Sequence, residues 1–443
     1  MRTRILGSLV ALMLAAAGVF ASTASARSAP PPTSGSSALV ASYVKVGYFT
    51  QWGIYRRNFL VRNVHTSGMA AKLTHINYAF ANVGADGRCF EANQAGVGDA
   101  WADYQKRFKA GESVDGVGDV ISQPLAGNFN QLRKLKAMYP QLKVQLSIGG
   151  WTWSKYISDA ALTAASRQAF VASCIDLFLK GNLPLIGTSP HGGPGSAYGV
   201  FDGFDIDWEW PGSEGNPGNV IRPEDKQNLT ALFAEFRRQL DEYGAQTGRT
   251  FSLTAFLPAD PARVAAGVEV ANAMSYLDFA TIQGYDLHGA WEPVTNHQGQ
   301  LFSPAADPSP ERFSVDLAVR TYLAGGAPAA KLVIGIPYYG RGWTGVPDVN
   351  RGLYQPGTAA PGTWEAGVED YKVLKALPGP RYFDGSAAAT WFYDGSTFWS
   401  YDDEQAIARK TGYVRQHRLG GTMVWELDAD DGTLTAAIAA GLS

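Results

Sequence analysis

The sequence has little cysteine and no cluster of basic charge. Only two cysteines, Cys89 and Cys174, occur among its 443 residues, so no more than one intrachain disulfide can form. The 37 Lys and Arg residues are scattered, and against 40 Asp and Glu residues they leave a net charge of −3. Nucleic acids and anionic lipid surfaces attract clustered positive charge, which this chain lacks. We therefore expect neither nucleic acid nor a membrane as a partner.

The pairing of the two cysteines stays open at the level of sequence. In an exported protein they could form one disulfide. However, Cys174 falls within a run of helical periodicity, Ala169 to Leu179, where a buried free thiol fits nearly as well.

Beyond its first residues the chain has no stretch apolar enough to span a membrane. The N-terminus combines a basic start, an apolar run over Ile5–Phe20 and the small residues Ala24-Ser25-Ala26. This combination is typical of a secretory signal peptide, so we predict that residues 1–26 are removed and that the protein is secreted and extracellular. Residues 27–41, which contain three consecutive prolines, are predicted to be a flexible leader that precedes one folded domain, 42–443.

No Gly-x-Gly-x-x-Gly motif follows the first predicted strand, which disfavours a dinucleotide-binding sheet. Short apolar runs instead alternate with helical patterns. Nearly continuous apolar strands that are separated by helices favour a parallel sheet. Eight such strands favour a closed (β/α)8 TIM barrel of the α/β class. The predicted strands are Val44–Phe49, His75–Ala81, Leu142–Ile148, Phe201–Trp208, Phe251–Leu257, Phe279–Tyr285, Leu332–Tyr338 and Gly421–Leu427. The predicted helices include Asn128–Met138, Ala160–Lys180, Pro223–Tyr243, Pro261–Met274, Ser314–Ala324 and Asp403–Gln416.

One interval interrupts this alternation. Residues 340–399, between the seventh strand and its helix, are rich in Gly, Pro, Tyr and Trp and contain the short runs Tyr371–Leu377 and Thr390–Tyr393. We predict that they form a small α+β subdomain. Because the active site of a TIM barrel lies at the carboxyl ends of its strands, this insertion is expected to form one wall of a groove there.

The stretch Phe201–Trp210 is the most unusual part of the sequence. From Phe204 onward apolar residues alternate with acids, so Phe204, Ile206, Trp208 and Trp210 are predicted on one face of a strand. The opposite face then carries Asp205, Asp207 and Glu209. Like charges at neighbouring positions repel, so this arrangement needs a physical reason.

Three explanations are open for these acids. A solvated face normally intersperses Lys or Arg, and none occurs between Phe201 and Trp210. A calcium or magnesium site would use clustered carboxylates, but the spacing of a calcium loop is missing. The third explanation is a set of carboxyl groups that share a proton, in which repulsion from Asp205 and Asp207 raises the proton affinity of Glu209. Glu209 could then act as a general acid.

Four segments together resemble family 18 of the glycoside hydrolases, the chitinases and their relatives. The stretch 202–209 is similar to the Asp-x-x-Asp-x-Asp-x-Glu signature of that family. Further similarity lies in 147–151 (Ser-Ile-Gly-Gly-Trp), 335–343 (Gly-Ile-Pro-Tyr-Tyr-Gly-Arg-Gly-Trp) and 420–426 (Gly-Gly-Thr-Met-Val-Trp-Glu). The resemblance covers essentially all of 42–443. In many family members a Met stands where this chain has Gln283, although the following Tyr285 and Asp286 are kept.

The resemblance implies a retaining hydrolase of chitin or chitooligosaccharides, in which the substrate's own acetamido group is the nucleophile. Glu209 would be the general acid, Asp207 would orient the acetamido group, Tyr285 would hydrogen-bond its carbonyl oxygen, and Asp205 would share charge. Substrate contacts are expected from Tyr48, Trp151, Asp286, Trp291, Arg341 and Trp425. Supporting roles are expected for Asp202, Ser147 and Gln283.

Two rival functions remain open. A non-catalytic chitin-binding lectin can use the same barrel, but in such a relative the residue in the position of Glu209 is expected to differ. An endo-β-N-acetylglucosaminidase acting on N-linked glycans is expected to lack the wall formed by 340–399. We expect a monomer that uses no cofactor and no metal.

Overall fold

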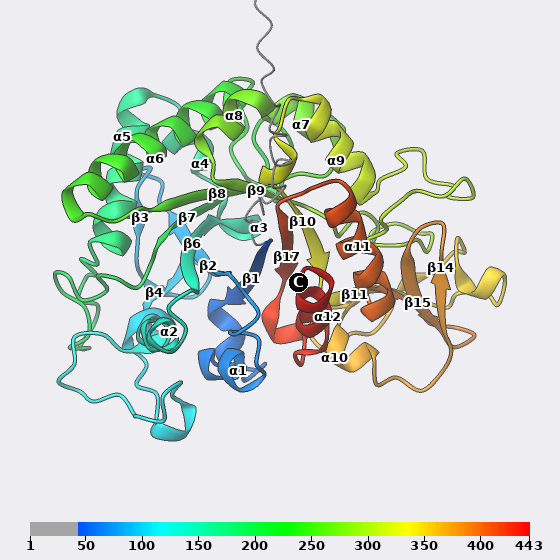
Figure 1. Cartoon of the computed structure of the whole chain (residues 1–443), viewed down its shortest axis with the longest axis horizontal. Coiled ribbons are helices and arrows are strands. Elements are labelled where there is room, and N and C mark those ends of the chain that lie inside the picture. The colour runs from blue at the N-terminus through cyan, green and yellow to red at the C-terminus, as the bar shows by residue number, and fades with distance from the viewer. Residues whose placement is uncertain (1–42) are drawn as a thin grey trace, which may run out of the picture. The chain divides into compact units, whose positions relative to one another are not determined.

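The computed structural model describes residues 43–443, so the predicted signal peptide and nearly all of the predicted leader lie outside the described residues. Eight parallel strands form a closed barrel, because β1 pairs with β2 on one side and with β17 on the other (Figure 1). The predicted TIM barrel is therefore confirmed. The barrel strands are β1 (Val44–Thr50), β2 (His75–Val83), β6 (Lys143–Gly149), β7 (Gly203–Asp207), β8 (Ser252–Leu257), β9 (Phe279–Ile282), β10 (Leu332–Pro337) and β17 (Gly421–Trp425).

Helices cover the outside of this barrel (Figure 1). In α6, Leu229, Phe233, Phe236 and Leu240 recur at helical spacing and are buried, which places one apolar face against the strands. The helices are α1 (Val61–Thr66), α2 (Gly127–Met138), α3 (Gly150–Trp153), α4 (Ile157–Ala161), α5 (Ala164–Cys174), α6 (Asp225–Thr247), α7 (Pro261–Gly267), α8 (Val270–Tyr276), α9 (Val315–Ala324), α10 (Tyr371–Leu374), α11 (Glu404–Gln416) and α12 (Thr433–Gly441).

Two predicted helices are each divided in the structure. The predicted helix 160–180 begins a new helix, α5, after Thr163, whose hydroxyl accepts a hydrogen bond from the backbone N–H of Ser166. The predicted helix 261–274 is split into α7 and α8, and α7 ends at Gly267. A Cβ at Gly267 would lie 2.2 Å from the carbonyl oxygen of Pro211, so close packing requires a glycine there. Apolar periodicity continues across such breaks, which is why it did not reveal them.

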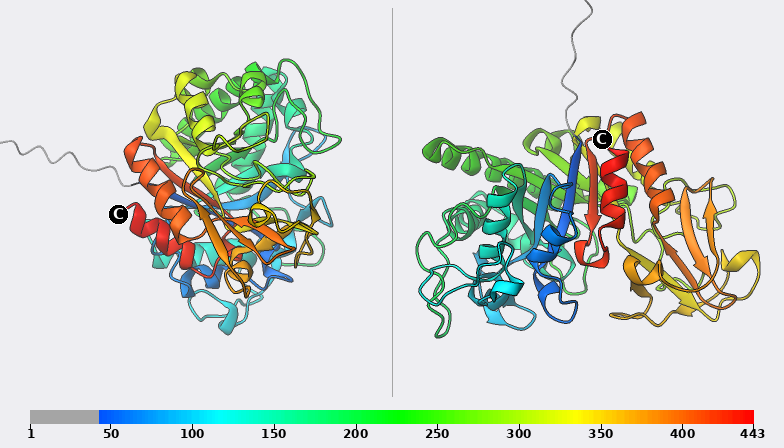
Figure 2. Two further views of the ribbon diagram at one scale, coloured as in Figure 1. Left: turned by 90° about the vertical axis from the view of Figure 1, so that its right-hand side faces the viewer. Right: turned by 60° about the horizontal axis from the view of Figure 1, so that its bottom comes forward.

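A second sheet is inserted between β10 and α11, as the sequence predicted. It consists of antiparallel strands with a small core of its own, which contains Trp343, Val346, Trp391 and Phe398. Figure 2 shows this sheet beside the barrel, next to α11. Its strands are β11 (Tyr339–Thr344), β12 (Thr358–Ala359), β13 (Val368–Asp370), β14 (Arg381–Asp384), β15 (Ala389–Tyr393) and β16 (Phe398–Tyr401).

A disulfide joins Cys89 to Cys174, which settles the alternative that the sequence left open. It links β3 (Cys89–Phe90), a short strand antiparallel to β2, to the last residue of α5. Two further two-residue strands, β4 (Asn93–Gln94) and β5 (Gly98–Asp99), form a small hairpin of their own.

None of the helices in residues 43–443 is long and apolar enough to cross a membrane.

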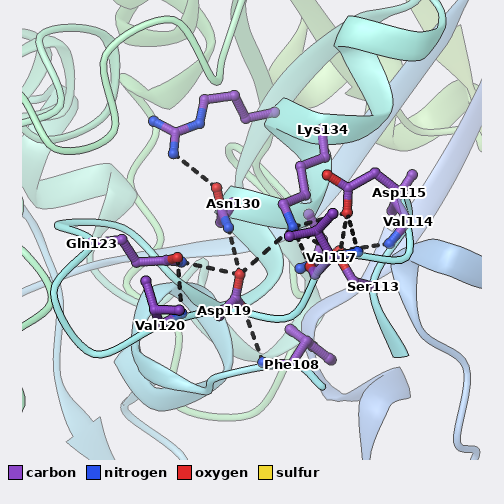
Figure 3. A network of polar contacts seen from close by, with 12 residues as sticks. Phe108, Ser113, Val114, Asp115, Val117, Asp119, Val120, Gln123, Asn130 and Lys134 are labelled. Atoms are coloured by element: carbon purple, nitrogen blue, oxygen red, sulfur yellow. Dashed lines mark hydrogen bonds and ion pairs between the residues drawn. The ribbon is translucent and has the colours of Figure 1, made fainter. Parts of the chain in front are cut away.

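Polar contacts hold the long connection that leads into α2 (Figure 3). The buried carboxylate of Asp119 accepts hydrogen bonds from the backbone N–H of Phe108 at 2.9 Å, from Gln123 at 3.0 Å and from Asn130 at 2.7 Å. Lys134 in α2 forms an ion pair with Asp115 of the same connection at 3.0 Å. The connection, which contains one short 3-10 helix, η3 (Ala110–Glu112), is thus fixed to α2 by side-chain contacts.

Candidate active site

The acids predicted on one face of β7 point into the barrel. Asp205 and Asp207 are 0% and 4% exposed, whereas Phe204 and Ile206 belong to the core between the strands and the helices. The prediction was wrong for Trp210, which packs in the inner cluster, 5.6 Å from the ring of Phe256. Because β7 ends at Asp207, strand alternation does not fix the direction of the residues that follow.

Asp205 is held by hydroxyl groups from three other strands of the barrel, β1, β6 and β8. Its Oδ2 accepts hydrogen bonds from the Tyr48 hydroxyl at 2.6 Å and the Ser147 hydroxyl at 2.8 Å, and its Oδ1 accepts one from Thr254 at 2.7 Å. Burial raises the pKa of Asp205, and these hydrogen bonds oppose that shift by stabilising the carboxylate. Asp205 therefore carries charge more readily than an isolated buried acid.

Asp207 is buried with fewer partners. Its Oδ1 has no hydrogen-bond partner among the described residues. Burial, followed by the charges of Glu209 and Asp205, raises the pKa of Asp207 well above the usual value. A buried acceptor without a donor is unusual in folded proteins, so this oxygen is available to a donor on a ligand.

Glu209 follows the end of β7, and its backbone is fixed on both sides. Its N–H donates to the Ser154 hydroxyl at 2.9 Å, and its carbonyl oxygen accepts from Asn219 at 3.0 Å. Burial raises the pKa of Glu209 to about 8, with a further contribution from the charge of Asp286, while Arg263 opposes the shift. From the sequence we expected repulsion from Asp205 and Asp207 to raise the pKa of Glu209. In the structure, burial and the charge of Asp286 produce most of this rise.

A cavity of about 960 Å³ opens at this end of the barrel. Asp205 and Ser147 lie outside its lining. The predicted residues that the structure brings together around it are Tyr48, Trp151, Asp207, Glu209, Gln283, Tyr285, Asp286, Trp291, Arg341 and Trp425.

Asp202 lies at the opposite, amino-terminal end of β7. It forms ion pairs with Lys136 at 2.8 Å and Arg249 at 3.2 Å, and it accepts a hydrogen bond from the backbone N–H of Val144 at 2.9 Å. Its contacts thus connect β7 to surrounding elements and lie away from the cavity.

Aromatic rings form much of the cavity surface. Trp425 stacks on Phe80 with 5.7 Å between ring centroids and an interplanar angle of 19°, and Tyr48 packs edge-on against it at 5.4 Å. Trp151 and Trp291 are 46% and 58% exposed, so their rings are accessible to a ligand.

Polar groups line the same cavity beside these rings. Asp286 binds Arg341 through two hydrogen bonds of 2.7 and 2.8 Å, and it accepts a third from the Tyr339 hydroxyl at 2.5 Å. The guanidinium of Arg341 also lies 5.0 Å from the ring centroid of Trp291. The Tyr285 ring is 7% exposed, and burial raises the pKa of its hydroxyl well above the usual value, so the hydroxyl stays protonated as a donor.

Sequence reasoning missed several residues of the cavity. Trp52 and Phe80 contribute rings near Trp425, and Arg263 contributes a positive charge near Glu209. Trp52 stands two residues after the end of β1, a position at which side chains reach the mouth of a barrel, so this signal was present. No comparable signal marks Arg263, which lies inside α7.

The described residues contain no group of three or more His, Cys, Asp or Glu side chains arranged to hold a metal ion.

Residues 44–430 match the family model described as glycosyl hydrolases family 18. The chain belongs to this family.

Similar proteins carry related names. The chain is 38% identical to chitinase A1 of Niallia circulans over 427 residues and 41% identical to chitinase C of Streptomyces lividans over 394 residues. These alignments cover 88% and 87% of this chain but 57% of each relative, so the chain spans less than two thirds of their length. The catalytic domain of psychrophilic chitinase B from Arthrobacter TAD20 superposes with a TM-score of 0.87 at 48% identity, over 90% of this chain and 95% of that domain.

The raised pKa of Glu209 predicts a pH-dependent effect of Glu209→Gln on stability. Between the pKa in the unfolded chain, about 4.3, and about 8 in the folded protein, folding requires Glu209 to retain a proton, so its contribution to stability falls as pH rises. Glutamine does not titrate. The melting temperature of the variant should exceed that of the native protein by about 1–3 °C at pH 8 and equal it at pH 4. A difference that is independent of pH in calorimetry would contradict the raised pKa.

Proposed function

We propose that this protein is a secreted chitinase, which hydrolyses β-1,4-linked N-acetylglucosamine polymers with retention of configuration. The observation that carries this proposal is the pairing of a protonated Glu209 with the unpartnered Oδ1 of Asp207 in one aromatic-lined cavity. The names of the relatives and the matched family agree with this activity. The signal-like sequence of residues 1–26 supports export.

Glu209 supplies the proton for bond cleavage. With a pKa of about 8 it holds a proton at neutral pH and can give it to the leaving glycosidic oxygen. As the C–O bond breaks, the 2-acetamido oxygen of the same substrate attacks the anomeric carbon and forms a cyclic oxazolinium ion. Water then opens this ring at the anomeric carbon, and the Glu209 carboxylate takes the proton that the water releases. Two displacements at one carbon restore its configuration.

Asp207 and Tyr285 position the substrate's nucleophile. The free Oδ1 of Asp207 accepts the acetamido N–H, and this hydrogen bond stabilises the positive charge that develops on the oxazolinium. The Tyr285 hydroxyl donates to the acetamido oxygen and holds it in line with the anomeric carbon. Asp205, with its three hydroxyl donors, shares the charge of this buried group.

The cavity also fits the faces of sugar rings. Trp425 forms an apolar floor, and the exposed rings of Trp151 and Trp291 flank it, since flat aromatic surfaces pack against the C–H groups of pyranose rings. Asp286 and Arg341 offer polar contacts to the chain. The Tyr48 hydroxyl donates a hydrogen bond to Asp205. We therefore propose that Tyr48 positions Asp205, in place of the substrate contact expected from the sequence.

The two rival functions fit less well. A lectin needs no proton donor, yet Glu209 is present beside Asp207 in the cavity. An endoglycosidase acting on N-linked glycans is disfavoured because Tyr339, Arg341 and Glu365 of the inserted segment line the cavity as one wall. Release of intact glycans from a glycoprotein without cleavage of chitin would favour that rival. We further propose that the protein acts as a monomer without a cofactor.

Replacement of Glu209 by Gln tests the assigned proton donor. The variant keeps the size of the side chain but has no acidic proton, so turnover of the N-acetylglucosamine hexamer should fall by about 10²–10⁴-fold. Its dissociation constant for the hexamer, measured by calorimetry, should stay within about threefold of the native value. Glu214→Gln is the matched control, because Glu214 is exposed, lies outside the cavity lining and should retain full turnover. Near-native turnover by Glu209→Gln would reject the assignment.

Substrates without the acetamido group test whether the nucleophile belongs to the substrate. Hexamers of glucose or of fully deacetylated glucosamine have the same β-1,4 linkage but no acetamido oxygen. We expect no cleavage of either under conditions that convert the N-acetylglucosamine hexamer completely, as judged by mass spectrometry of the products. Efficient cleavage of either hexamer would mean that a protein group provides the nucleophile.

A further inference from the structure

Arg57 joins three parts of the chain that are far apart in sequence. It lies between η1 (Gln51–Ile54) and α1, and its guanidinium contacts Asp370 at 2.7 Å, Glu426 at 3.0 Å and Asp428 at 3.3 Å. Asp370 ends β13 of the inserted sheet, whereas Glu426 and Asp428 follow β17 of the barrel. One cation therefore bridges the barrel and the insertion.

This ion cluster is largely removed from water. Side-chain exposure is 13% for Arg57, 2% for Asp370, 8% for Glu426 and 1% for Asp428. Lys372 of the insertion lies 3.3 Å from Asp370 and also donates to the carbonyl oxygen of Asp428. Buried carboxylates without a cation are strongly unfavourable, so loss of Arg57 would leave three acids with one lysine.

The cluster adjoins residues that form the floor and the wall of the cavity. Glu426 immediately follows Trp425, the ring that forms the floor. On the side of the insertion, the guanidinium of Arg57 lies 4.9 Å from the ring centroid of Trp364, whose Nε1 donates to Asp370 at 3.2 Å. Glu365, the next residue, lines the cavity.

We propose that Arg57 is a positioning residue for polymer binding, which holds the inserted wall at a fixed distance from Trp425. This proposal rests on the proposed chitinase function. Arg57 does not line the cavity itself, so it acts through Glu426 and Asp370. Its loss should weaken the binding of long substrates, which contact both floor and wall, more than it slows the chemical step at Glu209.

Arg57→Met tests this role, because methionine keeps much of the length of the side chain without its charge. The KM for the N-acetylglucosamine hexamer should rise about tenfold while kcat stays within about threefold of the native value. Arg57→Lys keeps the charge and should restore part of the KM. Arg56→Met is the matched control: Arg56 is exposed, lies over the same Trp364 ring and forms no ion pair among the described residues, so its KM should be native.

The stability of Arg57→Met should also depend on pH. Arg57 lowers the pKa values of Glu426 and Asp428, which burial raises, so without it both groups bind protons more tightly in the folded protein than in the unfolded chain. The loss of melting temperature should therefore be largest at pH 8 and shrink toward pH 5. Glu426→Gln, which removes one of the three acids, should restore part of that loss in the Arg57→Met background.

Hydrogen exchange separates this proposal from the proposed function, since it requires no activity. Amides of 358–370 and 425–428 should exchange faster in Arg57→Met than in Arg56→Met. Suppose that the native protein fails to cleave chitin while these amides still exchange faster in Arg57→Met. In that case the chitinase assignment would fail, but the positioning role of Arg57 in the structure would stand. A folded Arg57→Met variant with unchanged hexamer KM and unchanged exchange would overturn the positioning role.

Discussion

Acids that repel one another must stay together in a site that is nearly closed to water. Asp205 and Asp207 are both almost fully buried at the end of β7, and Glu209 follows them. Such a group is tolerable only if protons are retained or if donors surround the charge. The barrel meets both conditions, because hydroxyls on β1, β6 and β8 converge on Asp205 while burial keeps a proton on Glu209.

Other buried acids around the cavity are also balanced by charged partners. Asp286 raises the proton affinity of Glu209, and Arg341 neutralises Asp286 through two hydrogen bonds. Behind the floor of the cavity, Arg57 balances a second set of buried acids that includes Glu426. Asp205, Asp286 and Glu426 thus each depend on partners supplied by distant parts of the chain. Catalytic geometry and the attachment of the inserted sheet are in this sense parts of one electrostatic arrangement.

Local patterns were enough to predict the barrel and the acidic face of β7, because strand alternation and the repetition of strand and helix are properties of neighbouring residues. Three features were beyond their reach. Trp210 turned inward because β7 had already ended. Glu209 and Asp286 follow different strands, β7 and β9, so the charge of Asp286 affects Glu209 only once the barrel has formed. Arg57 and Asp428 are 371 residues apart, and no short motif connects them. Interactions of this kind depend on distances that only the folded chain defines.

The proposed substrate-assisted mechanism makes a direct prediction about stereochemistry, namely retention of the anomeric configuration. The anomeric configuration of the first product can be read by proton NMR within minutes of mixing the protein with the N-acetylglucosamine hexamer, before mutarotation mixes the anomers. Attack by the acetamido oxygen followed by attack by water predicts that the new reducing end is released as the β-anomer. Initial release of the α-anomer would mean a single displacement by water and would contradict the roles assigned to Asp207 and Tyr285.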